Sequence, residues 1–365
     1  MYADLGLDFL DVRLASALFG LALGVLFGVL AQRTRFCLRR SVAGAPEERR
    51  SAAGVWLTAL AVAVLGTQTV IALGYVDFSE HRFFVADLPV LAIVAGGLLF
   101  GAGMVLTRGC VSRLTVLGAS GNLRALTVLL VFAVVAHATL KGVLAPLRTS
   151  LGSATVNLGD LTGFAALPGG AWGWTAVLVI VAGAVVIRSG NTPGTLVLAA
   201  LLGALVPLGW AGTGYVLYDD FDPIALESLS FTSPASESLF FVIASSAIPA
   251  GFGTGLVGGT LLGALVASLI SREFKWASFD SPTQTGRYMA GAAMMGVGGV
   301  LAGGCTVGAG LAGIPTLSFA ATLALVSIAV GGALTGRLFP EGGATSPSLG
   351  GSGAQASKPR ALPAE

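Results

Sequence analysis

GAGMVLTRGC, residues 101–110, occurs a second time in this chain as GVGGVLAGGC, residues 296–305. Six of the ten positions match without a gap, at an offset of 195 residues, the difference between 305 and 110. Each copy is an apolar, glycine-rich run that ends in Gly-Cys, and two of the three cysteines of the chain end these copies. We call them the GC segments and expect the rest of the chain to be the scaffold that brings them together.

The composition indicates the class of protein. Hydrophobic residues make up 55% of the 365 residues, charged residues make up 10%, and the mean hydropathy is +0.86. A soluble domain has about 25% charged residues. Apolar runs long enough to cross a bilayer recur along the chain, and they are continuous rather than alternating, which argues against a membrane β-barrel. The sequence therefore predicts an all-α polytopic membrane protein.

The apolar runs predict about nine transmembrane crossings in one transport domain, residues 1–339. Four arginines in RTRFCLRR, residues 33–40, surround Cys37 and mark a cytoplasmic loop, so the amino terminus is expected outside and the carboxyl terminus inside. The tail, residues 340–365, is rich in Gly, Ser, Ala and Pro and is predicted to be disordered. The expected crossings are residues 14–31, 52–74, 88–121, 123–144, 176–187, 196–217, 239–270 with a break near Pro249, 288–303 and 317–334.

With this count the two GC segments enter the membrane from opposite sides. Similar segments with opposite entry predict an inverted repeat, with repeat one at about 14–145 and repeat two at about 172–338. Broken helices of such repeats meet near the bilayer midplane in many transporters. The first crossing also resembles a later one, because Gly20 and Gly24 followed by an arginine are similar to Gly259 and Gly263 followed by an arginine.

A helix that starts after each Gly-Cys would present free N–H groups and the positive end of its dipole, which attracts anions. Gly109 and Gly304 would let an anion approach the backbone closely. Arg108 lies beside the first break, and a charge inside a membrane is functional by default. A single buried cysteine usually serves packing, but Cys110 and Cys305 at equivalent positions of a repeat favour a function.

Other polar residues have structural interpretations. We interpret Arg113 and Arg124 as side chains that snorkel to the interface, and His81 as part of a loop surface. Since no two Cys or His residues have ligand spacing, we predict no metal site, and we expect no cofactor and no nucleic-acid partner.

Three motifs resemble the YeeE/YedE family of bacterial sulfur-transport membrane proteins, whose best-studied branch takes up thiosulfate. They are RTRFC at residues 33–37, GAGMVLTRGC at 101–110 and GGVLAGGCTVGAGLAG at 298–313. The resemblance extends to about Arg337 and implies an hourglass of helices with cysteines along a central path in the inner membrane. It implies that Cys37, Cys110 and Cys305 contact the substrate, and the candidate substrate-binding set also includes Arg108, Gly109, Gly304 and Thr306.

The resulting hypothesis is a transporter that imports thiosulfate or a related sulfur anion, and not an enzyme. Thiol groups would donate weak hydrogen bonds in series while helix N-termini offset the charge. A separate TusA-like sulfurtransferase is the implied cytoplasmic partner, beside the lipid bilayer itself. Two alternatives stay open: a membrane thiol sulfurtransferase or oxidoreductase that forms a persulfide, and a passive anion channel. No Walker motif is present, which disfavours direct use of ATP.

Overall fold

The computed structural model describes residues 11–159, 161–219 and 222–339, so the predicted tail lies outside the described residues. Within these ranges, nine helical segments are long and apolar enough to cross a membrane, which confirms an all-α polytopic membrane protein with about nine crossings. The segments are Val12–Ala43, Pro46–Ala72, Val90–Ala119, Leu123–Lys141, Gly170–Ile187, Pro193–Val216, Phe252–Ile270, Pro282–Thr316 and Phe319–Leu338.

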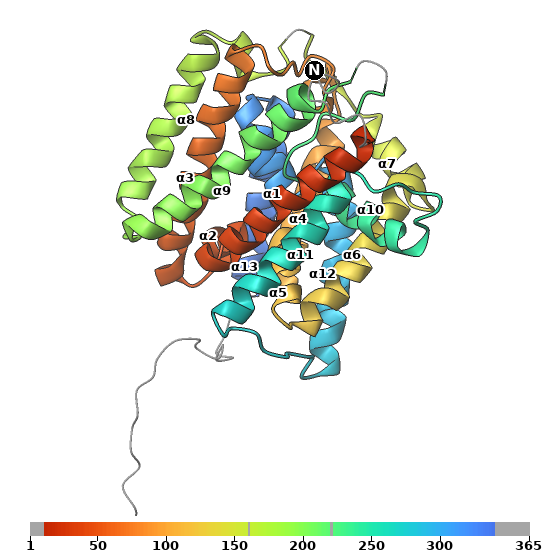
Figure 1. Cartoon of the computed structure of the whole chain (residues 1–365). Helices are drawn as coiled ribbons and strands as arrows, with labels where there is room; N and C mark the ends of the chain where they lie inside the picture. Colours follow the sequence, from red (N-terminus) through yellow and green to blue (C-terminus); the bar gives the residue numbers. More distant parts are fainter. Residues whose placement is uncertain (1–10, 160, 220–221, 340–365) are drawn as a thin grey trace, which may run out of the picture.

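The helices are numbered along the chain as in Figure 1. The first half has α1 (Val12–Thr34), α2 (Leu38–Ala43), α3 (Pro46–Ala72), η2 (Arg82–Phe84), α4 (Val90–Leu106), α5 (Val111–Ala119), α6 (Leu123–Lys141), α7 (Ala145–Gly152) and η3 (Phe164–Ala166). The second half has α8 (Gly170–Ile187), α9 (Pro193–Ala211), η4 (Gly212–Val216), α10 (Thr232–Ile243), α11 (Phe252–Ile270), α12 (Pro282–Leu301), η5 (Thr306–Gly313), η6 (Ile314–Thr316) and α13 (Phe319–Leu338). Two short strands, β1 (Asp87–Leu88) and β2 (Val156–Asn157), pair antiparallel.

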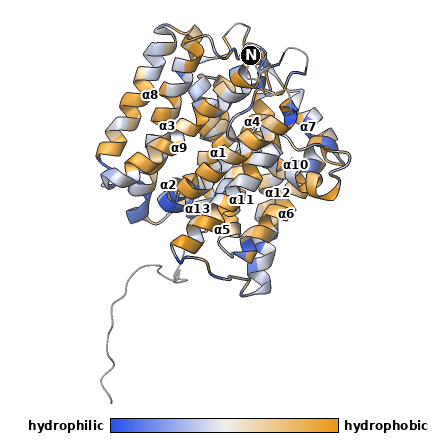
Figure 2. Ribbon diagram, in the orientation of Figure 1, coloured by the Kyte–Doolittle hydropathy of each residue, from blue (hydrophilic) through white to orange (hydrophobic). Residues whose placement is uncertain are grey.

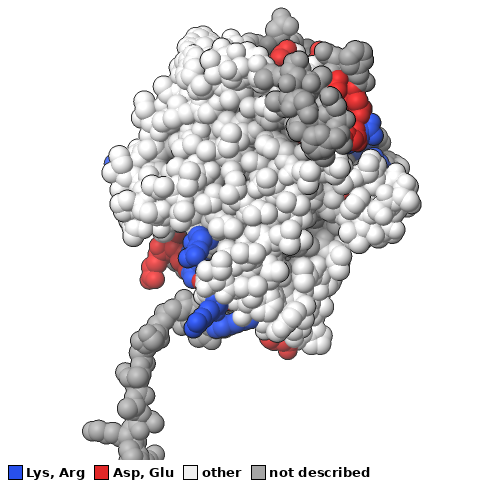
Figure 3. All heavy atoms as spheres, viewed as in Figure 1, with Lys and Arg blue, Asp and Glu red and all other residues white. Residues whose placement is uncertain are grey.

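The outer surface matches a bilayer environment. On the face shown in Figure 3, charged side chains gather near the two ends and a broad uncharged band lies between them. The outward surfaces of the long helices are largely hydrophobic (Figure 2). On α8, for example, Ile180 is 69% exposed and Val181 is 58% exposed, which would be costly in water but suits contact with lipid tails.

Glycines set the closest helix contact, between α1 and α11. A Cβ atom on Gly20, Gly24 or Gly28 of α1 would overlap backbone atoms of Phe252, Leu256 or Thr260 of α11, in that order. The two helices therefore run parallel, side by side (Figure 1). Helices that correspond in an inverted repeat have opposite directions, so the parallel helices α1 and α11 do not correspond to each other. Their similar glycines instead allow the close contact between these two helices.

The two GC segments do run in opposite directions. Gly96 of α4 lies against Gly298 of α12, while Gly103 lies against Gly291, so the two helices are antiparallel. The other pairings follow the same symmetry: α1 packs on α11 as α9 packs on α3, and α4 packs on α13 as α12 packs on α6. We propose on this basis that α1, α3, α4 and α6 correspond to α9, α11, α12 and α13, with α8 as the additional crossing.

One predicted crossing is wrong in its extent. Residues 239–270 were expected to form one long broken span, but the structure separates them into α10 and α11. The residues between the two helices include Pro249 and Gly251, and Ala244 leaves the helical conformation at φ −140° and ψ 50°. Proline lacks an N–H group and cannot continue the hydrogen-bonded ladder, so the helix ends before it.

Candidate functional site

Both GC segments contain the same backbone break. The helix α4 ends with Arg108 in the left-handed region at φ 60°, and α12 ends with Gly303 at φ 73°, again 195 residues apart. The capping hydrogen bonds also correspond, since the amide of Thr107 donates to Gly103 at 3.0 Å and that of Ala302 donates to Gly298 at 2.9 Å. Glycine adopts this conformation without strain, whereas arginine does so at a cost.

Each cysteine then occupies the position before the next helical segment. Cys110 is the N-terminal cap residue of α5 and Cys305 that of η5, and both have extended backbones. The carbonyl of Cys110 accepts a hydrogen bond from Leu114 at 2.9 Å, and that of Cys305 accepts one from Ala309 at 2.9 Å. Two helix N-termini thus lie inside the protein, as the sequence predicts.

The adjacent glycines differ in how tightly they are packed. A Cβ atom on Gly109 would lie 3.3 Å from the side chain of Leu114, which can move. A Cβ atom on Gly304 would lie 2.9 Å from the backbone nitrogen of Ala309, which cannot move without disturbing η5. Gly304 is therefore required by close packing, and Gly109 is less constrained.

All three cysteines are buried and have free thiols. The Cys110 thiol lies 3.4 Å from the hydroxyl of Ser112, and the side chains of Cys37 and Thr306 are also its neighbours. Thr306 directly follows Cys305 in the chain. The structure therefore brings the two breaks together, because a residue of the second break touches the sulfur of the first.

Cys305 belongs to the second break, which meets the first break at Thr306. Its sulfur accepts a hydrogen bond from the amide of Gly308 at 3.4 Å, one turn further along η5. Every residue from Thr306 to Gly313 is buried, so this segment lies in the protein interior. Irregular backbone at membrane depth is tolerated only in such a buried position or along a cavity.

Cys37 joins Cys110 from the same half of the chain. It is the cap residue of α2, just after the left-handed residue Arg35 that ends α1. Arg113 of α5 lies close to both thiols and donates a hydrogen bond to the carbonyl of Ala31 at 3.5 Å. Its interpretation as a snorkelling side chain is wrong, since the guanidinium points into the protein. We call Cys37, Cys110, Ser112 and Arg113 the thiol cluster.

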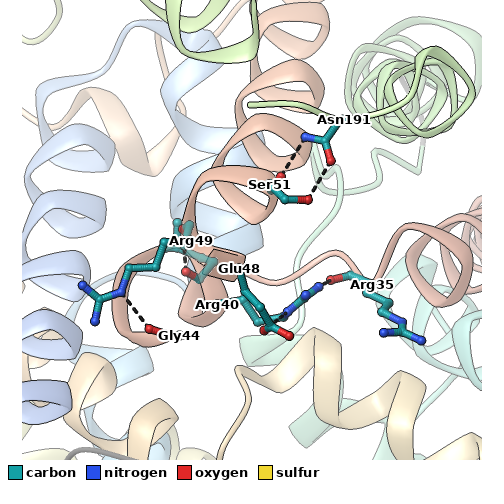
Figure 4. A network of polar contacts seen from close by, with 9 residues as sticks. Arg35, Arg40, Gly44, Glu48, Arg49, Ser51 and Asn191 are labelled. Atoms are coloured by element: carbon teal, nitrogen blue, oxygen red, sulfur yellow. Dashed lines mark hydrogen bonds and ion pairs between the residues drawn. The ribbon is translucent and has the colours of Figure 1, made fainter. Parts of the chain in front are cut away.

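Hydrogen bonds hold the segment that carries Cys37 (Figure 4). Arg40 donates to Glu48 at 3.3 Å and to the carbonyl of Arg35 at 3.3 Å, which ties the end of α1 to α3. Arg49 donates to the carbonyl of Gly44 at 2.7 Å and closes the turn between α2 and α3. Some of the arginines that predict the cytoplasmic side therefore also fix the backbone beside the thiol cluster.

The backbone of Arg108 forms the left-handed turn of the first break. Its side chain is half-buried, and it is not among the residues that line the two cavities near η2. The arginine that the structure places beside the thiols is Arg113, which the sequence analysis did not select. Only tertiary structure reveals this, because the neighbours of Arg113 come from α1 and α2.

A cavity of about 430 Å³ lies beside the loop that follows α3, at the opposite end of that helix from α2. It lies between the loop before η2, the 225–234 segment and η5, and Gly308 and Ala312 form part of its wall. We call it the Arg82 cavity after the arginine that lines it. Arg82 also lines a second cavity of about 330 Å³, together with Arg148 and Gly303.

Hydrogen bonds fix the walls of the Arg82 cavity. The hydroxyl of Ser318 donates to the carbonyl of Phe83 at 2.6 Å and anchors η2. The hydroxyl of Thr213 donates to the carbonyl of Glu227 at 2.7 Å and accepts from its amide at 3.1 Å. His81 lies in the loop before η2 and is half-buried against Trp210, with ring centroids 5.4 Å apart.

Burial changes the protonation of two groups in this cavity. Burial raises the pKa of Glu227 to about 7, the nearby Glu237 adds to the rise, and Arg82 opposes it. Burial lowers the pKa of His81 to about 4, with a further contribution from Arg82. His81 is therefore neutral at physiological pH. Among the described residues no group of three His, Cys, Asp or Glu side chains could hold a metal ion.

Known proteins resemble this chain over most of its length. A family model described as Sulphur transport matches residues 33–334. The thiosulfate transporter TsuA of Escherichia coli is 27% identical over 343 residues, which cover 86% of this chain and 92% of that protein. TsuA of Spirochaeta thermophila is 26% identical over 347 residues, which cover 86% of this chain and 96% of that protein.

The family model spans the first crossing's arginine loop, both breaks and all three cysteines. This match confirms the resemblance to the YeeE/YedE proteins that the three cysteine motifs carry. Together with the long apolar helices, it shows a multi-pass membrane protein with a role in transport. The chain belongs to the Sulphur transport family.

Proposed function

We propose that this protein imports thiosulfate through the membrane along a path formed by Cys305, Cys110 and Cys37. The observation that carries the proposal is the contact between Thr306 and the Cys110 thiol, which joins two oppositely directed breaks inside the protein. Both relatives are named thiosulfate transporters, which supports the choice of anion.

The site chemistry suits a soft divalent anion. Dehydrating a dianion in hydrocarbon would cost many kcal/mol, so the path must replace the lost water contacts. Free amides after each break, the Arg113 charge and the thiol hydrogens can do this in sequence. Because S–H groups are weak donors, each contact would hold the anion without trapping it, as conduction requires.

We place the protein in the inner membrane with the amino terminus outside. The arginines of residues 33–40 lie at the end opposite the Arg82 cavity, and positive residues beside crossings stay in the cytoplasm. The thiol cluster is then on the cytoplasmic side of the junction and the Arg82 cavity on the outer side. A separate TusA-like sulfurtransferase would receive the sulfur at the cytoplasmic end, as the family resemblance implies.

Uptake of radiolabelled thiosulfate by liposomes that contain the purified protein tests this proposal. Loss of a hydrogen bond to a charged group costs about 1.5–3 kcal/mol, so Cys110→Ala should slow uptake roughly 10- to 150-fold. Ser120→Ala is the control, because that hydroxyl bonds only to the carbonyl of Val116 in its own helix at 3.0 Å. Unchanged uptake by correctly folded Cys110→Ala would remove the thiol path.

A second function has one observation in its favour. The contact between Cys37 and Cys110 supplies the neighbouring thiol that the sequence does not reveal and that a sulfurtransferase needs. A Cys110 thiolate would attack the sulfane sulfur of thiosulfate, form a persulfide and release sulfite, with the S–S bond electrons leaving on sulfite. Mass spectrometry after exposure to thiosulfate separates the functions: one added sulfur on Cys110 supports the enzyme, and an unmodified protein that transports supports the path.

A further inference from the structure

The Arg82 cavity contains a cation without a partner. Within the described residues, the guanidinium of Arg82 has no hydrogen bond or salt bridge, and its recorded contact is with the Phe83 ring, 5.3 Å from the centroid. The side chain remains accessible because it lines two cavities. A guanidinium carries five donors in a planar fork that matches the oxygens of an oxyanion.

The same cavity contains a carboxyl group without a partner. Glu227 is half-buried, and its side chain has no hydrogen bond or salt bridge to another described residue. Only its backbone is held, by Thr213. An ionised Glu227 would attract Arg82 and repel an incoming anion, whereas a neutral Glu227 would leave the Arg82 charge to the anion.

We propose that the Arg82 cavity is a proton-linked anion site, in which Arg82 binds the divalent sulfur oxyanion and Glu227 takes up a proton as the anion enters. This inference rests on the proposed function, because the cavity is the outer entrance to the path: Gly308 in its wall is the residue whose amide contacts Cys305. Each proton that enters with the anion reduces the net negative charge that must cross the membrane.

The charged groups around Glu227 define the expected titration. Asp77, Glu80, His81 and Arg82 face the cavity from the loop before and within η2. Glu237 of α10 repels Glu227, and Lys141 at the end of α6 in turn attracts Glu237. Cys305 also interacts with the Arg82 charge from the second break.

Glu227 is the group expected to titrate near neutral pH. Its pKa is raised to about 7, while that of His81 is lowered to about 4. Hydrogen bonds from Ser79 lower the pKa of Asp77, which stays ionised. A bound dianion adds negative charge and raises the pKa of Glu227 further, so binding takes up protons, and by linkage the affinity must fall as pH rises above about 7.

Calorimetric titration of thiosulfate into the detergent-solubilised full chain measures this linkage. Thiosulfate does not itself titrate between pH 5.5 and 8.5, so any proton taken up belongs to the protein. At pH 8, titrations in two buffers of different ionisation enthalpy should give an uptake approaching one proton per anion, and at pH 5.5 almost none. The dissociation constant should rise by up to about tenfold per pH unit above pH 7.

Two matched glutamine variants locate the proton. Glu227→Gln should bind thiosulfate with an affinity that no longer depends on pH and without proton uptake. Glu47→Gln makes the same change at an exposed residue in the first turn of α3, away from the cavity lining, and should behave as the wild type. Arg82→Gln should weaken binding at least about tenfold across the pH range.

The outcomes separate this inference from the proposed function. Wild-type protein that transports thiosulfate but binds it with a constant affinity from pH 5.5 to 8.5 overturns the proton linkage and leaves the path intact. Proton uptake that persists in Glu227→Gln also overturns it. If no thiosulfate is transported while binding with proton uptake is observed, the proposed function fails instead. The wild-type titration tests the proton linkage without any variant, so the test remains possible even if Glu227→Gln does not fold.

Discussion

The two breaks of this molecule share a backbone and differ in their surroundings. Both have a left-handed residue, a glycine and a buried cysteine at the same offset. In the first break, however, Arg113 lies at the position that Gly308 occupies in the second. In the first break the cation near the thiols is Arg113, which belongs to the same segment. In the second break the cation is Arg82, which belongs to a distant segment of the chain.

A second thiol likewise lies near only one of the two breaks. Cys37 contacts Cys110 in the first break, while the segment near Gly308 offers the hydroxyl of Ser230. The two breaks thus share their backbone geometry, but they differ in the neighbouring arginine and in the presence of a second thiol. The first break therefore has two thiols and a cation close together, and the second break lies beside the Arg82 cavity.

Removing the cation of the first break should have the largest effect. Arg113→Gln keeps a polar side chain but removes the charge beside Cys37 and Cys110, which is worth about 1.5–3 kcal/mol to a bound anion. Thiosulfate uptake by liposomes should fall roughly 10- to 150-fold. Arg124→Gln is the matched control, because Arg124 pairs with the exposed Asp280 at 3.1 Å. Equal uptake by both variants would show that the charge of Arg113 does not contribute to transport.

The glycines before the cysteines should respond unequally. Gly304→Ala forces a Cβ atom against the backbone of Ala309, and such overpacking costs about 1–3 kcal/mol. Gly109→Ala meets only the movable side chain of Leu114 and should cost less. Thermal unfolding in detergent should therefore give a lower midpoint for Gly304→Ala than for Gly109→Ala. The reverse order would contradict the packing difference between the breaks.

Separating the two breaks should produce an intermediate effect. Thr306→Val keeps the volume of the side chain but removes the hydroxyl group that neighbours the Cys110 thiol, a loss of about 1 kcal/mol if the two groups bond. Uptake should fall about fivefold while the protein still folds. Thr127→Val is the control, since that exposed hydroxyl bonds only to the carbonyl of Leu123 in its own helix at 2.8 Å. If Thr306→Val transports as fast as the control, the junction does not depend on this contact.

Making the breaks more alike should have the smallest effect. Arg108→Gly gives the first break the residue type that the second has at Gly303, and it relieves a left-handed conformation that costs an arginine about 1–2 kcal/mol. Greater freedom of glycine in the unfolded chain offsets about 0.5–1 kcal/mol of this gain. The interaction of the Arg108 side chain is lost as well, so the unfolding midpoint should change little. A clear decrease would mean that the Arg108 side chain stabilises the break.

Residues next to each other in the chain were predictable, and residues from distant segments were not. Hydropathy located the crossings, because a helix must expose apolar residues to lipid wherever it lies. The repeated Gly-Cys motif likewise predicted both breaks, since a local backbone conformation depends on local residues. Pro249 shows the limit of this approach: the sequence indicated a break near it, yet could not tell one interrupted span from the two separate helices that form.

The sequence by itself therefore determined the membrane class, the two breaks and their opposite directions. Only the tertiary structure decided which polar groups meet. Arg113, Arg82 and Glu227 carry no distinctive motif, and their surroundings come from helices and loops far apart in the chain. Such contacts depend on how helices pack across the fold, and helix packing is set by side-chain shapes at many distant positions together.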